Sequence, residues 1–334
     1  MNARLEQRIL LPALLLSLSL LAPSRGWAHQ VPAAVRDPTL MGFLTSWNFR
    51  AEVMLVLAVL ASAYTRGWWC LQKQGQRGTA RRWRAASYLT GLMVVGLALL
   101  SSIDRFASIL FTLHMVQHLL LVTVAAPLLL LADPLPAFLW ALPRRTRHRV
   151  GRLLRRDAAI RQGLWSLTWM PVAWLVFVGN LWAWHHPTAY QAALRHDVIH
   201  DLEHLTFFGT ALLFWWPIIN PAPRVHGRIH PGHPTLHILY LTTATAQNIV
   251  LGALIALPER VLYPFYTTVP RLWGLSPLHD QALGGGIMWV SAHMYLLPIL
   301  LVVARLLNEE ERVEAWIEIR HTPPTQQDRA YKRP

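Results

Sequence analysis

The chain has 334 residues, of which 54% are hydrophobic and only 14% are charged. A soluble domain carries roughly 25% charged residues, so this composition argues against a soluble enzyme or binding domain and indicates a membrane protein. The formal charge of +14 does not indicate a nucleic-acid partner, because the Lys and Arg residues lie in the links between apolar runs and form no basic face interleaved with aromatics. A single cysteine, Cys70, excludes a disulfide framework and CxxC chemistry within one chain.

The first 28 residues have the pattern of a secretory signal peptide. Arg4 and Arg8 supply the positive region, residues 9–22 form the apolar core, and Gly26-Trp27-Ala28 is a small-x-small cleavage pattern. Cleavage after Ala28 would leave His29 as the mature N-terminus, and an uncleaved anchor is the alternative.

Seven apolar runs follow, each close to the ~20 residues that cross the hydrocarbon core of a bilayer. They lie at about 48–69, 86–104, 107–131, 165–183, 203–220, 235–257 and 284–306. The sequence therefore predicts an all-α fold, a polytopic membrane helix bundle with about seven transmembrane helices after a cleavable signal peptide. The expected divisions are a signal peptide (1–28), a transmembrane domain (29–306) and a cytoplasmic tail (307–334).

The basic residues predict the orientation of the bundle. Six Lys and Arg residues lie at the end of the first span and in the link after it, and eight Arg residues follow the third span. Both links should be cytoplasmic, because cytoplasmic loops carry the excess of Lys and Arg. The mature N-terminus is then outside and the C-terminus cytoplasmic, which agrees with removal of a signal peptide.

A histidine pair opens the third span, in its predicted outer half. His114 and His118 are four residues apart and share one helix face, and Gln117 borders that face. Polar residues inside a membrane are costly and by default suggest a functional site. The alternative is a pair of histidines that only hydrogen-bonds between helices.

The densest histidine region is the predicted outer loop between the fourth and fifth spans. It holds His185, His186, Tyr190, His196, His200 and His204. The last three histidines are spaced i, i+4, i+8, which predicts a ladder on one helix face, although His196 would also fit a solvated position. Asp197, Asp201 and Glu203 lie between them as acceptors that can fix imidazole tautomers.

Two further groups lie later in the chain. Asp280 and Gln281 precede three glycines, 284–286, which favour close helix packing and would bring both polar residues near the third and fifth spans. A second set of histidines, His226, His230, His233 and His237, precedes the sixth span. This set faces the cytoplasm in the predicted topology, so it cannot join the outer histidines, and its setting favours a solvated loop.

Imidazole binds copper, zinc, iron and nickel alike, so the spacing names no metal. The absence of other thiols and the presence of Met115, Met288 and Met294 near the histidines favour copper. Two alternatives stay open on the residues alone. One is a membrane b-type cytochrome with His118 and His204 as axial haem ligands. The other is a copper transporter that uses the few polar residues of the middle of the bundle, Asn180, Gln247 and Asn248.

Four motifs together resemble the polytopic CtaG-type (caa-type) cytochrome c oxidase assembly factors. They are His-Met-Val-Gln-His-Leu-Leu-Leu at 114–121, Trp-His-x-Pro-x-x-Tyr at 184–190, His-Asp-Leu-Glu-His-Leu-Thr-Phe at 200–207 and Asp-Gln-x-Leu-Gly-Gly at 280–285. The resemblance runs from about residue 40 to residue 306. The matching site positions are His114, Gln117, His118, His185, Tyr190, His200, Glu203, His204, Asp280 and Gln281, whereas His186, His196 and His279 stand outside the pattern.

The resemblance implies a non-enzymatic assembly factor in a bacterial plasma membrane, with cytochrome c oxidase subunits or other oxidase assembly factors as partners. We expect copper to be delivered to the oxidase through the outer histidine cluster. His118 and His204 are the first candidate ligands, followed by His114, His200 and His185. Glu203 would orient an imidazole, and Gln117, Tyr190, Asp280 and Gln281 would surround the site.

Overall fold

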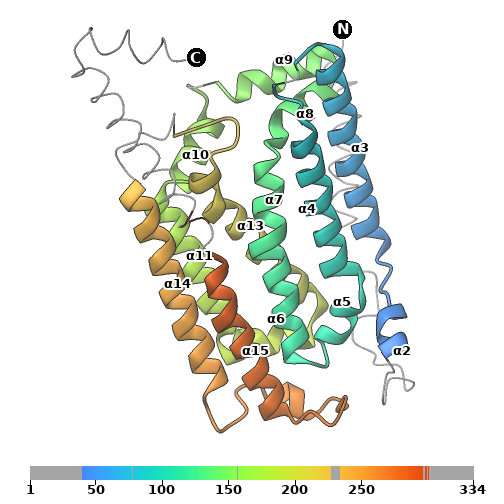
Figure 1. The fold of residues 1–334 in the computed structure, drawn as a ribbon, viewed down its shortest axis with the longest axis vertical. Helices are drawn as coiled ribbons and strands as arrows, with labels where there is room; N and C mark the ends of the chain where they lie inside the picture. Colours follow the sequence, from blue (N-terminus) through green and yellow to red (C-terminus); the bar gives the residue numbers. More distant parts are fainter. Residues whose placement is uncertain are drawn as a thin grey trace, which may run out of the picture.

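The computed structural model describes residues 40–76, 78–155, 157–226 and 234–295, with residues 298 and 300. Within these ranges all regular structure is helical, and the long helices run side by side as one bundle (Figure 1). The predicted signal peptide, the predicted tail and most of the second half of the seventh predicted span lie outside the described residues.

The helices fall into two sets along the chain. The first half contains α2 (Leu40–Thr45), α3 (Ala51–Lys73), α4 (Arg82–Leu100), α5 (Ser102–Ala107), α6 (Phe111–Leu119), the π-helix η1 (Leu120–Ala125), α7 (Ala126–Leu131), α8 (Pro134–Ala141) and α9 (Arg144–Leu153). The second half contains α10 (Ala159–Leu167), α11 (Met170–His185), α12 (Pro187–Arg195), α13 (Asp197–Ile219), α14 (Pro234–Ala256), the 3₁₀-helix η2 (Pro264–Thr267), α15 (Pro277–Ser291) and the 3₁₀-helix η3 (Ala292–Tyr295).

Five helical segments in the described ranges are long and apolar enough to cross a membrane. They are Ala51–Lys73, Arg82–Ala107, Phe111–Leu131, Asp197–Ile219 and Thr235–Ala256. The pair α10 and α11 adds a sixth span if it is counted as one, although it bends by 65° at its break. The predicted polytopic all-α fold is confirmed. The seventh predicted span starts as α15, and its further course lies outside the described residues.

The outward faces of these helices fit a lipid surround. Large apolar side chains are exposed there, for example Leu55, Val59, Met93, Leu175, Leu254 and Val290. Apolar patches of this extent are rare on soluble monomers. Lipid contact accounts for them, because the hydrocarbon core of a bilayer is as apolar as these side chains.

The span that carries the histidine pair contains a π-helical turn, and Pro127 explains it. A proline has no N–H to donate and crowds the preceding turn of a helix, and single π-turns absorb such a disturbance. The Val122 carbonyl, five residues before Pro127, instead accepts a hydrogen bond of 2.9 Å from the Trp215 indole of α13. This bond joins α13 to the third span at Val122, one helical turn after His118.

Glycines bring α15 against its neighbours. A Cβ atom built on Gly252 of α14 would lie 2.8 Å from the Trp289 nitrogen, and one on Gly285 would lie 2.6 Å from the Ala256 nitrogen. Only glycine allows this approach of two backbones. Asp280 fixes the start of α15 to the start of α6, because its carboxylate accepts hydrogen bonds from the Phe111 and Thr112 backbone N–H groups at 2.7 and 3.0 Å.

The two ends of the bundle differ in character. At one end, called the arginine end, α9 lies across the bundle with the sequence Arg-Arg-Thr-Arg-His-Arg-Val-Gly-Arg-Leu and has no buried residue (Figure 1). The opposite end, called the histidine end, holds α2, α5 and the starts of α6, α13 and α15. The arginine-rich α9 thus lies at the end of the bundle opposite the histidine motifs, as the sequence predicts, while Arg50 lies at the histidine end.

Candidate metal centre

Three helices bring five histidines together at the histidine end. His114 and His118 come from α6, His185 is the last residue of α11, and His200 and His204 lie on α13. Each is at most 6% exposed. Residues up to 90 positions apart in the chain therefore form one buried group, called the histidine cluster.

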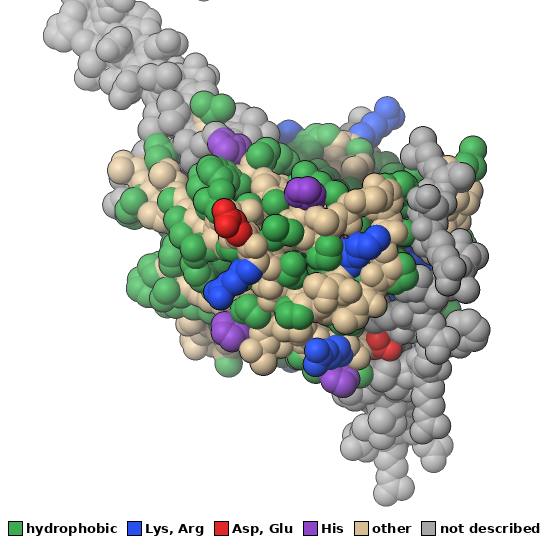
Figure 2. All heavy atoms as spheres, turned by 90° about the horizontal axis from the view of Figure 1, so that it is seen from below, with side chains coloured by type: hydrophobic (Ala, Val, Ile, Leu, Met, Phe, Trp, Pro, Cys, Tyr) green, Lys and Arg blue, Asp and Glu red, His purple; other side chains and the backbone are tan. Residues whose placement is uncertain are grey.

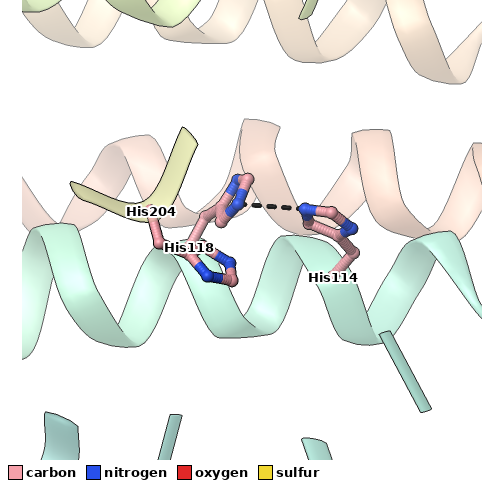
Figure 3. A group of neighbouring side chains, drawn as sticks. All are labelled: His114, His118 and His204. Atoms are coloured by element: carbon pink, nitrogen blue, oxygen red, sulfur yellow. Dashed lines mark hydrogen bonds between the residues drawn. The ribbon is translucent and has the colours of Figure 1, made fainter. Parts of the chain in front are cut away.

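Within the cluster the imidazole rings contact one another directly. The Nε2 atoms of His114 and His118 lie 3.0 Å apart, at hydrogen-bond distance, and the two rings are nearly perpendicular (Figure 3). The ring centres of His118 and His204 are 5.3 Å apart, and those of His200 and His204 are 4.3 Å apart. His114 in turn lies 5.3 Å from His200. The spacing of four residues on both helices produces this interlocking arrangement.

The ligand atoms converge closely enough for a metal ion. One set of three is His114, His118 and His204, and a second set is His114, His200 and Glu203. In each set the candidate ligand atoms lie within 4.8 Å of one another. Metal-bound imidazole nitrogens about 2 Å from a common ion lie closer together than that, so small side-chain rotations would complete the coordination.

Glu203 is the only carboxylate within the cluster among the described residues. It is fully buried, and its oxygens lie 3.5 Å from His114 Nε2 and 3.8 Å from His118 Nε2. Neither oxygen accepts a hydrogen bond. A buried charged carboxylate without donors is unfavourable unless it takes up a proton or a cation neutralises it, so this position suits a metal ligand or an acceptor for the proton of a metal-bound imidazole.

A backbone carbonyl fixes the orientation of the His185 ring, as is common for histidine ligands of metals. Its Nδ1 atom lies 2.7 Å from the Leu181 carbonyl oxygen, which can only accept, so we place the proton on Nδ1. Its Nε2 atom is buried and has no hydrogen-bond partner. Histidine ligands of metals commonly donate the other ring N–H to a carbonyl in this way.

Tyrosines pack on the cluster. Tyr190 is fully buried with its ring centre 5.0 Å from that of His114, and its hydroxyl is 3.0 Å from the Tyr266 hydroxyl. Tyr263 donates a hydrogen bond to the His185 carbonyl at 3.0 Å. The structure thus brings Tyr190 to the cluster as expected. Tyr263, just before the short η2, and Tyr266, within it, also belong to this tyrosine group, and no motif spacing indicated them.

Gln117, Asp280 and Gln281 hold the scaffold around the cluster. The Gln117 side chain donates to the Ala98 carbonyl at 2.9 Å and to Asp104 at 2.8 Å, on the side of α4 and α5. Gln281 accepts from the Leu262 N–H at 2.6 Å and donates to the Ile255 carbonyl at 3.1 Å. With the backbone bonds of Asp280, these contacts position the starts of α6 and α15 and do not point into the cluster.

The ladder predicted for His196, His200 and His204 is shorter than expected. α13 begins at Asp197, and His196 stands before it in an extended conformation with its side chain exposed. His186 and His279 are exposed as well. Figure 2 looks onto this end and shows histidines on a surface that also carries apolar groups and several basic and acidic side chains. Of the i, i+4, i+8 series, only His200 and His204 belong to the cluster.

The histidines before the sixth span lie apart from the cluster. His226 Nε2 is 2.8 Å from the Thr168 hydroxyl at the break between α10 and α11, and His237 is buried on α14. His230 and His233 lie outside the described residues. The expectation that this set does not join the cluster agrees with the position of His226. The expectation of a solvated loop is wrong for His237, because α14 already begins at Pro234 and buries it.

Two polar contacts near the cluster were not predicted. Arg50, just before α3, binds both carboxylate oxygens of Asp201 at 2.8 and 3.0 Å, so Asp201 pairs with a guanidinium. Asp104 accepts from Asn48 at 2.9 Å as well as from Gln117. The one available signal was the presence of charged residues at predicted span ends, and it does not reveal partners.

Fold and site together define a polytopic helical membrane protein with a buried imidazole and carboxylate cluster near one end of its bundle. Residues 62–309 match the family of cytochrome c oxidase caa3 assembly factors (Caa3_CtaG), and the chain belongs to this family. The match covers all four motifs, so the resemblance drawn from them is confirmed.

Three curated mycobacterial proteins are similar to the chain. The uncharacterized proteins Mb0105 of Mycobacterium bovis and MT0111 of Mycobacterium tuberculosis are each 26% identical over 301 residues, or 86% of this chain. The uncharacterized protein ML1998 of Mycobacterium leprae is 24% identical over 291 residues, or 85% of this chain. The alignments span only 42–43% of these relatives' own lengths. No solved structure gives a significant match.

Proposed function

We propose that this assembly factor holds copper transiently in the histidine cluster and passes it to a cytochrome c oxidase subunit at the predicted outer face of the membrane. The observation that carries the proposal is the convergence of His114, His118 and His204, whose ligand atoms lie within 4.8 Å of one another in a buried site of a caa3 assembly factor. Copper is the cargo in this reaction and leaves with the partner.

The donor set supports transfer more than permanent storage. Two or three imidazoles with an open position bind copper while leaving room for an incoming ligand from the partner. Glu203, 3.5 Å from His114, would neutralise part of the metal charge and accept an imidazole proton. The exposed His186, His196 and His279 on the same end would offer weaker ligands on the way out.

The position of the basic residues supports delivery on the outer side. α9 at the arginine end would face the cytoplasm by the positive-inside rule. The cluster is at the other end of the bundle, within the first turns of α6 and α13. A copper ion released there would reach a partner outside the cytoplasm.

The geometry favours copper over the haem alternative. The His118 and His204 rings stand edge to face with centres 5.3 Å apart, and His114 and Glu203 lie against the same rings. The cavity beside the cluster has a volume of about 40 Å³, whereas sites for drug-sized ligands measure roughly 300–1,000 Å³. A porphyrin plane between these two rings would require the helices to separate.

The test compares copper and haem per chain in the purified full-length protein and in a His118→Ala/His204→Ala variant, with His196→Ala as a matched control on the exposed side. We expect at least one copper per chain, in equal amount, in the wild type and in the control, a loss of most of it in the double variant, and no Soret band. Oxidase maturation in cells should fail with the double variant only. Haem without copper, or copper retained by the double variant, would overturn the proposal.

A further inference from the structure

A cavity borders the histidine cluster at His118 and His185, which both line it. It lies between α6, α11, α13, α14 and α15 and has a volume of about 40 Å³. Its lining includes Met115, His118, His185, Phe207, Asn248 and Met288, and it is called the methionine cavity below. A space of this size holds a single ion or a few water molecules.

The ring nitrogens at the methionine cavity are unusual for a buried site. His185 Nε2 is buried and has no hydrogen-bond partner, while its Nδ1 is bound to the Leu181 carbonyl. His118 Nδ1 is also buried without a partner, while its Nε2 faces His114. Buried polar atoms in native proteins nearly always have partners. Two such nitrogens lie on residues that line one small cavity, and each can bind an occupant there, His118 in the tautomer that carries its proton on Nε2.

Two other polar side chains of the lining, Asn248 and Ser291, are already engaged. The Asn248 side chain donates to the Met288 carbonyl at 3.0 Å, and the Ser291 hydroxyl donates to the same carbonyl at 2.8 Å. Phe207 packs its ring against His118 with centres 4.4 Å apart and lies 5.9 Å from His185. The lining therefore offers a bound ion imidazole nitrogens from His118 and His185 and thioether sulfurs from Met115 and Met288, within a mainly apolar wall.

This donor set differs from that of the neighbouring cluster. Thioether sulfur is a soft ligand that selects monovalent copper, whereas carboxylate oxygen suits harder ions. Met115 and Met288, at 2% and 7% exposure, are held inside the bundle, and within the described residues no carboxylate lines the cavity. The chemistry of the lining is therefore that of a Cu(I) site.

We propose that the methionine cavity is a second copper position, specific for Cu(I), with His185 and His118 as nitrogen ligands and Met115 and Met288 as sulfur ligands. His118 can serve either position, because its Nε2 faces His114 of the cluster and its Nδ1 has no hydrogen-bond partner. A neutral imidazole has one nitrogen lone pair, so His118 binds one copper ion at a time. A copper ion would move between the two positions by exchange at this one residue. The inference extends the proposed copper-holding function to a two-position relay.

The experiment uses full-length protein in detergent, titrated with Cu(I) without oxygen against a chromophoric Cu(I) chelator, with X-ray absorption at the copper edge to detect sulfur ligands. Met115→Leu/Met288→Leu removes both sulfurs at nearly constant volume. Met54→Leu/Met93→Leu, on exposed faces of α3 and α4, is the matched control. We expect two Cu(I) per chain with sulfur scattering in the wild type and control, and one Cu(I) without it in the cavity variant.

A cluster variant, His200→Ala/His204→Ala, separates the two proposals. If it keeps one sulfur-ligated Cu(I), the methionine cavity binds independently of the cluster and the inference stands. If no chain ever shows sulfur scattering while the cluster still binds copper, the inference is overturned and the proposed function survives. Sulfur scattering that persists in the Met115→Leu/Met288→Leu variant would also overturn it, since the sulfur would then come from other methionines.

Discussion

Two buried carboxylates at opposite ends of the bundle differ in their hydrogen-bond partners. Asp133, at the turn before α8, accepts hydrogen bonds from the Ala222 N–H at 2.7 Å, from Arg84 at 3.1 Å and from Arg224 at 3.3 Å. Glu203, in the histidine cluster, is more deeply buried and accepts none. A carboxylate satisfied by three donors serves the fold, whereas Glu203 lies among imidazoles without a donor, as the proposed copper site would require.

The remaining buried acids in the described ranges follow Asp133. Asp104 accepts from Asn48 and Gln117, and Asp280 accepts from two backbone N–H groups of α6. Since buried polar groups are nearly always satisfied, Glu203 is the exception that requires an explanation. Copper bound by the neighbouring imidazoles is the explanation that follows from the proposed function.

The largest effect should come from Asp133→Asn, which removes the charge that joins α4 to the loop after α13. We expect a loss of ~2 kcal/mol in unfolding free energy. This is below the ~3–5 kcal/mol for breaking a fully buried ion pair, because Arg224 is 58% exposed. Unfolding in detergent measures the loss, and copper per folded chain should stay at the wild-type value. A variant as stable as the wild type would show that Asp133 is dispensable.

Glu203→Gln tests whether the carboxylate in the histidine cluster serves copper binding and not the stability of the fold. The amide removes a buried charge that no hydrogen-bond donor stabilises, so we expect unfolding free energy to be unchanged or higher. Copper affinity should fall ~10–100-fold, the effect typical of residues that support metal ligands. Competition with a copper chelator measures the affinity.

Asp201→Asn is the matched control for Glu203→Gln, because it makes the same chemical change two residues away, where the acid pairs with Arg50. It should leave copper affinity unchanged. If Glu203→Gln instead destabilises the chain as Asp133→Asn does and binds copper normally, Glu203 has a structural role and the contrast between the two ends fails.

The sequence predicted the parts of this contrast that depend on local periodicity. Apolar runs gave the spans, and the four-residue spacings of His114 and His118 and of His200 and His204 placed each pair on one helix face. The fourth predicted run, 165–183, overlaps α11 over most of its length, but its spacing did not reveal the break before Met170, where Pro171 lies in the first turn of α11.

The partners of polar residues could not be predicted from the sequence in the same way. Gln117 lies three residues from His114, yet its amide points to Asp104 on another helix. The pairing of Asp133 with Arg84 joins positions 49 residues apart. Such contacts depend on how the helices pack, which the spacing within one helix does not determine.

The smallest expected effect is a change in acid stability at His226, which lies near the arginine end and outside the histidine cluster. Burial lowers the pKa of this imidazole below its ordinary value, which is ~6.5. The unfolded chain therefore takes up this proton more readily than the folded one, and stability is lost as the pH falls below about 6.5. His226→Gln removes the group while offering an amide to the Thr168 hydroxyl, so its melting temperature should fall slightly less than that of the wild type between pH 7.5 and pH 5.5. Protonation of the cluster histidines acts on both proteins and cancels in the difference. An equal fall in both would show that His226 makes no contribution to the acid sensitivity of the fold.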